Sequence, residues 1–134
     1  MDFSSLVLME KDNETGFLGK NLGSFSVEEG AEYVRRLFVY KEEVNVVFNT
    51  KRDVEEWEFS AIFDLFNVEA FTALGYNIED DEEEYNPTWL IKFKYEEEID
   101  HEKMRAIINE ICNLIDVNMK KVFLDIEGKE EEYK

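Results

Sequence analysis

The chain has 134 residues, a mass of 15.9 kDa and a formal net charge of −18 at pH 7. Its 44% of apolar residues exclude a disordered chain, because they suffice to build a core and offset the entropy lost on folding. The surplus of acids excludes the protein classes that bind nucleic acid or anionic membranes, since both need Lys and Arg to neutralise phosphate. We expect one α+β domain over residues 1–128, followed by a frayed acidic tail over residues 129–134.

The first part of the chain predicts a hairpin. Residues 3–11 are mainly apolar, and they indicate a strand. Residues 12–16 carry the Asp, Asn and Gly typical of a turn, and residues 17–25 indicate a second strand. Gly19 and Gly23 weaken that strand and favour a bulge or a position at the sheet edge.

A short helix and a second hairpin are expected next. Ser26 and Glu29 have the spacing of a capping box, which predicts a helix after Ser26. Residues 37–40 and 44–49 are rich in Val and Phe and are separated by a polar loop. They predict the second hairpin.

The remaining elements are two helices around one strand. Residues 54–66 are apolar on all sides after the first turn, so we expect a helix that is deeply buried or lies between the sheet and a partner. A further helical turn follows and ends at Gly75. Residues 88–95 alternate between an aromatic and a mainly basic face, as in a strand. From Asp100, apolar residues at three- and four-residue spacing predict a long last helix.

The element order is therefore β-β-α-β-β-α-β-α. Local hairpins predict a mainly antiparallel sheet of about five strands. We expect a two-layer sandwich in which the helices cover one face of this sheet and the other face stays polar or open to a partner.

The sequence offers little catalytic chemistry. It contains none of the glycine-rich phosphate loops, zinc-protease motifs or nucleophile elbows whose spacing signals an enzyme. His101 and Cys112 lie eleven residues apart, about 16 Å along one helix, and so cannot act as a pair. We therefore assign no catalytic, metal-binding or cofactor-binding residue, and we expect His101 on the surface and Cys112 in the core.

Location is predicted from the cysteine and from the first residues. A single cysteine cannot form an intramolecular disulfide, which favours a reducing compartment. Residues 6–9 form an apolar run too short for a signal peptide or a membrane span. We expect a cytoplasmic protein.

Acids are concentrated in one part of the chain. Residues 76–102 contain eleven acids and two bases, which is half of the net charge. Such a segment could simply be a solvated loop and a helix start, or it could dock onto a basic protein surface. The candidate partner-binding residues are Glu79, Asp80, Asp81, Glu82, Glu83, Glu84 and Tyr85.

Three functions remain open at this stage. The first is an interaction or regulatory module that docks onto a basic partner protein, which would require acids clustered around exposed aromatic side chains. The second is a ligand-binding protein or enzyme with an aromatic-lined pocket. The third is a homodimer that pairs its spare sheet face or long helix with a second copy. Candidate walls for the pocket are Trp57, Phe63, Trp89 and Phe93.

Overall fold

The computed structural model describes residues 4–12, 14–96 and 98–134. Phe3 and Asn13, which the sequence assigns to the first strand and turn, lie outside the described residues, as does Glu97 of the acidic segment. The strands are β1 (Ser4–Lys11), β2 (Leu18–Val27), β3 (Val34–Tyr40), β4 (Glu43–Asn49), β5 (Asn77–Asp81) and β6 (Thr88–Lys94). The helices are α1 (Glu56–Leu65), α2 (Glu69–Thr72) and α3 (His101–Asp125), with 3-10 turns η1 (Ala31–Tyr33) and η2 (Glu130–Glu132).

The strands form one mixed sheet in the order β2-β1-β3-β4-β6-β5. Four neighbouring pairs are antiparallel, and only β1 and β3 run parallel. The mainly antiparallel α+β fold is thus confirmed. The predicted edge position of β2 is also correct, and its register shifts opposite Leu8 and Met9, where Gly23 pairs with Leu8.

Two elements differ from the sequence expectation. The predicted helix after Ser26 is wrong, because Ser26 pairs with Ser5 within the β1–β2 ladder and only the 3-10 turn η1 follows. The sheet also has six strands rather than about five. The additional strand is β5, whose sequence NIEDD carries residues that strands usually avoid and which forms by pairing with β6.

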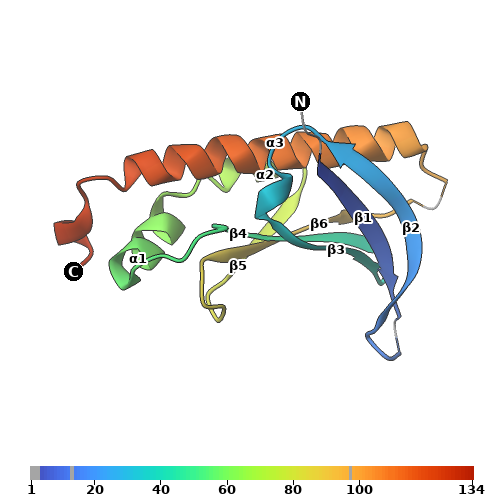
Figure 1. The fold of residues 1–134 in the computed structure, drawn as a ribbon, viewed down its shortest axis with the longest axis horizontal. Coiled ribbons are helices and arrows are strands. Elements are labelled where there is room, and N and C mark those ends of the chain that lie inside the picture. The colour runs from blue at the N-terminus through green and yellow to red at the C-terminus, as the bar shows by residue number, and fades with distance from the viewer. Residues whose placement is uncertain (1–3, 13, 97) are drawn as a thin grey trace.

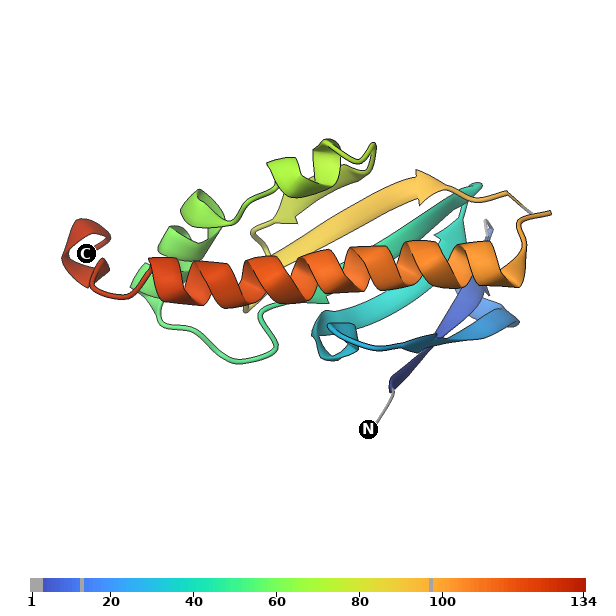
Figure 2. The same cartoon turned by 90° about the horizontal axis from the view of Figure 1, so that it is seen from above.

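All the helices contribute to a core on one face of the sheet. In Figure 1, α3 lies across this face, and Figure 2 shows α1 and α2 beside it on the side of β5. The core joins alternate residues of β3, β4 and β6 to the apolar stripe of α3. At its centre Trp89 stacks on Phe48 and Phe66, with ring centroids 5.2 and 4.4 Å apart. The expectation that helices cover one face is therefore correct.

One glycine allows α3 to approach the sheet. Gly30 has φ 90°, and a Cβ atom at this position would collide with the backbone carbonyl of Cys112 on α3. Only glycine meets both requirements, because it adopts the left-handed backbone conformation without strain and has no Cβ atom to collide with the carbonyl. The turn before β3 is thereby pressed directly onto the backbone of α3.

Among the described residues, no helix covers the other face of the sheet. Phe38 lies there at 8% exposure, because long cationic side chains cover its ring. Lys11 Nζ and Arg36 Cζ lie 5.1 and 5.9 Å from the ring centroid. We call this side the open face.

Candidate functional site

The acidic run divides between the two sides of the sheet. In β5, Asp80 pairs with Trp89, so its side chain lies on the helix side, whereas Glu79 pairs with Leu90 on the open face. Glu79 Oε2 lies 3.9 Å from Lys92 Nζ. The side chain of Asp81 lies on the same side of β5 as that of Glu79. This alternation follows from the two-residue period of a strand. The six acids therefore do not form one surface.

A shallow groove lies between α1 and the hairpin formed by β5 and β6. Its volume is about 530 Å³. Two aromatic rings line it from α1, with centroids 5.0 Å apart in an edge-to-face arrangement. Carboxylates come from both elements, since Asp64 belongs to α1 and Asp80 and Glu82 to the hairpin. The lining residues are Phe59, Ser60, Phe63, Asp64, Asp80 and Glu82. We call this the aromatic–acidic groove.

The start of α1 is held by charged groups. Glu55 and Glu58 form a capping box in which Glu58 Oε1 accepts a hydrogen bond from Glu55 N at 2.9 Å. Arg52 pairs with Glu58 at 3.2 Å and places its guanidinium 4.2 Å from the Phe123 ring of α3. Although burial raises the pKa of Glu58, the bonds from Glu55 and Arg52 lower it more, so the pKa lies below its ordinary value.

The groove lies over the core, and a hydrogen bond holds its margin. Phe63 rests against the fully buried Trp89, with ring centroids 5.2 Å apart. The hairpin turn is tied to the segment before α1, because Asn86 Nδ2 donates to Asp53 Oδ1 at 3.0 Å. Next to this anchor, Tyr85 is 78% exposed. An exposed aromatic side chain therefore stands beside the acids.

The C-terminal residues lie against α1. Tyr133 donates its hydroxyl to Asp64 Oδ2 at 2.7 Å, and this bond raises the pKa of Tyr133. Its ring packs on the core cluster. Tyr133 therefore fixes the orientation of one of the groove's carboxylates.

The other residues that the sequence analysis discussed lie in the β5–β6 turn, at the start of α3 and in the core. Among the candidate partner-binding residues, Glu83 and Glu84 are exposed in the turn and do not line the groove. His101 begins α3, where its ring stacks on Phe25 at 4.6 Å and its Nε2 lies 3.0 Å from Ser24 O. Cys112 is buried, and burial raises the pKa of its thiol to about 12.

The four candidate pocket walls do not surround one cavity. Trp89 is enclosed in the core, and Phe63 separates it from the groove. Trp57 lies at the other end of α1, where its Nε1 donates to Glu55 Oε2 at 2.9 Å. Phe93 packs edge-on against Tyr76. The four aromatic side chains therefore lie in different parts of the structure and do not form the walls of one pocket.

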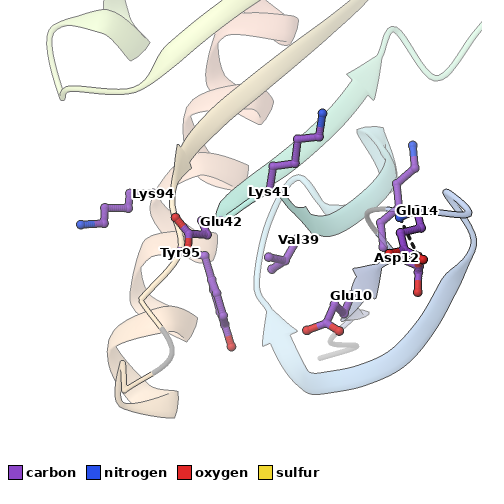
Figure 3. A pocket seen from close by; sticks show the side chains of 9 residues that line it. Glu10, Asp12, Glu14, Val39, Lys41, Glu42, Lys94 and Tyr95 are labelled. Carbon is purple, nitrogen blue, oxygen red and sulfur yellow. Dashed lines mark hydrogen bonds between the residues drawn. The ribbon is translucent and has the colours of Figure 1, made fainter.

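A larger cavity of about 830 Å³ lies at the end of the sheet, by the β3–β4 turn. Figure 3 shows Glu42 and Tyr95 on one side of it and Glu10, Asp12 and Glu14 on the other. Its lining mixes acids and lysines. Within the described ranges, no group of three or more His, Cys, Asp or Glu residues could hold a metal ion.

No helix in the described part of the chain is long and apolar enough to cross a membrane. Residues 1–134 match the model of DUF6762, which is described as a family of unknown function. The chain belongs to this family. Searches of curated proteins and of solved structures found no match.

Sequence reasoning missed part of the groove. Phe59 and Asp64 were not singled out, because acids and aromatic residues are common throughout the chain. The available signal was the apolar character of α1 on all sides, which predicted a helix in contact with either the core or a partner. Phe59 is only half-buried, so this apolar surface is not fully used by the core.

Proposed function

We propose that this protein is an interaction module that docks onto a basic surface of a partner protein through the β5–β6 hairpin. The observation that carries the proposal is the high exposure of the Tyr85 side chain beside the acidic turn. Clustered acids speed the encounter with a cationic surface, and an exposed tyrosine supplies contact area after the encounter.

The net charge supports this function. A small domain needs a net charge of only about 2–8 in magnitude for solubility, whereas this chain carries −18. Three successive acids, Glu82, Glu83 and Glu84, form the turn between β5 and β6.

The test begins with affinity capture from the native cell, with the wild-type chain and the triple variant Glu82→Gln, Glu83→Gln, Glu84→Gln as paired baits. We expect a cationic protein that the variant captures less well. Association rates are then measured between about 20 and 300 mM salt, a range that brackets weak and strong screening. The variant should associate more slowly and with a flatter salt dependence. Equal rates at all salt concentrations would contradict the proposal.

A second candidate, the homodimer, is favoured by the charge of the open face. Lys11, Arg36, Lys92 and Lys94 lie on this side with only three acids, Glu43, Glu79 and Asp81. Two copies of a chain at −18 repel one another, and this nearly neutral face is where they could approach. Sedimentation equilibrium should then show a dimer that strengthens with salt and is lost in Arg36→Glu. A monomer at all salt concentrations would exclude it.

We also propose that the protein acts in the cytoplasm. The support is its single cysteine, which is buried and free. Cell fractionation followed by immunodetection tests this directly. We expect the protein in the cytosolic fraction, and its recovery from the culture medium would contradict the proposal.

A further inference from the structure

We infer that the aromatic–acidic groove is the recognition site for an arginine side chain of the partner. This inference rests on the proposed function and names the group that the docking hairpin reads. The groove offers two different attractions to one ligand: the rings of Phe59 and Phe63, and the carboxylates of Asp64, Asp80 and Glu82.

Guanidinium fits this combination better than the other cationic side chain does. Its flat face stacks on aromatic rings, and its edge carries donors arranged to meet carboxylate oxygens. The ammonium of lysine is a compact, strongly hydrated charge that does not stack. The carboxylates of the groove come from two elements, so they can meet the guanidinium edge from opposite sides.

The same motif already occurs inside this chain. Arg52 places its guanidinium 4.2 Å from the ring of Phe123 and bonds to Glu58 at 3.2 Å. This internal site combines one ring with one carboxylate. The groove has two rings and three carboxylates, and among the described residues no cationic side chain forms a cation–π contact or an ion pair with them.

The acidic run provides a matched control, because only some of its acids line the groove. Asp80→Asn with Glu82→Gln removes two charges from the groove. Glu83→Gln with Glu84→Gln removes two charges from the same hairpin, at exposed positions that do not line the groove. Both double variants have the same net charge, so a difference between them cannot come from long-range attraction alone.

The probes are synthetic hexa-arginine and hexalysine peptides, and binding is measured by calorimetry on the full chain. A Trp57→Phe background leaves Trp89 as the reporter tryptophan, beneath Phe63. Hexa-arginine should bind more tightly than hexalysine and should change Trp89 fluorescence. The groove variant should weaken hexa-arginine binding by about tenfold, or about 1.4 kcal/mol, since each of the two exposed charges contributes up to about 1 kcal/mol. The turn variant should weaken it by less than about threefold, through screened long-range attraction.

The outcomes separate this inference from the proposed function. Equal weakening by both double variants overturns the groove site and leaves docking by the acidic hairpin intact. No weakening by either variant overturns both. A preference for hexalysine overturns the assignment of arginine. Circular dichroism of each variant confirms that it is folded before its binding is compared.

Discussion

Helices α3 and α1 cover the same face of the sheet, but they differ in how many of their residues are buried. Nine of the 25 residues of α3 are buried, and the turn at Gly30 meets its backbone directly. Only Ala61 and Ile62 are buried among the ten residues of α1, and the space beside Phe59 remains open as a groove. This difference in burial indicates that α3 contributes more to stability, and it leaves α1 with the open side on which we propose recognition takes place.

The largest expected effect breaks the contact of α3. Gly30→Ala should destabilise the fold by about 3 kcal/mol or more, because left-handed strain and a collision with the Cys112 carbonyl add together. Gly75→Ala is the matched control, since Gly75 has the same φ of 90° and no atom near the added Cβ. It should cost only about 1–2 kcal/mol. Urea unfolding midpoints compare the two, and equal losses would show that the approach of Gly30 to α3 is unimportant.

The second prediction compares side chains on the two helices. Ile111→Ala on α3 should cost about 2–5 kcal/mol, because Ile111 is 1% exposed and its loss leaves a cavity. Phe59→Ala on α1 should cost less, about 1 kcal/mol, although it removes a larger side chain, because Phe59 is half-buried and chiefly loses its edge contact with Phe63. Chemical denaturation of both variants gives the order, and the reverse order would contradict the division between the helices.

The third prediction is a pH dependence at the start of α1. Folding lowers the pKa of Glu58. This carboxylate therefore stabilises the fold at pH values above its ordinary pKa of 4.5, and the stabilisation is lost as the pH falls through the pKa of the folded state. Glu58→Gln should therefore cost about 0.5–1 kcal/mol at neutral pH and almost nothing in strong acid. Thermal unfolding across pH 7 to about 3 tests this, and a difference that grows on acidification would have the wrong sign.

The smallest expected effect on stability concerns the groove. Asp80→Asn with Glu82→Gln should change the unfolding free energy by less than about 0.5 kcal/mol, because exposed carboxylates contribute little to folding. Differential scanning calorimetry of this variant beside the wild type measures the change. A loss as large as that of Ile111→Ala would make these acids part of the fold instead of part of a binding site.

The sequence predicted elements whose signal is local. The apolar spacing of α3 and the alternation of β6 were sufficient, and both elements formed close to their expected bounds. The capping box at Ser26 failed because pairing with β1 outweighed a local preference for helix. Strand β5 was missed because its acids resemble a loop, and it becomes a strand only through its partner β6.

The groove was harder to predict than the fold. Its acids were visible as a run, but the run itself did not show which carboxylates share a side. Phe59 and Asp80 lie apart in the chain and line the same groove only because the fold brings α1 and the β5–β6 hairpin together. A contact of this kind depends on the three-dimensional packing, which residue spacing does not specify.

Hydrogen exchange with and without hexa-arginine tests the division between the two helices most directly. Without the peptide, the amides in the middle of α3 should exchange more slowly than those of α1, because nine residues of α3 are buried and only two of α1 are. With the peptide, α1 and the hairpin from β5 to β6 should gain protection while α3 stays unchanged. Two results would contradict the account. One is protection gained at the cavity around Glu10 and Glu42 instead, and the other is hydrogen exchange in α1 as slow as in α3 before the peptide is added.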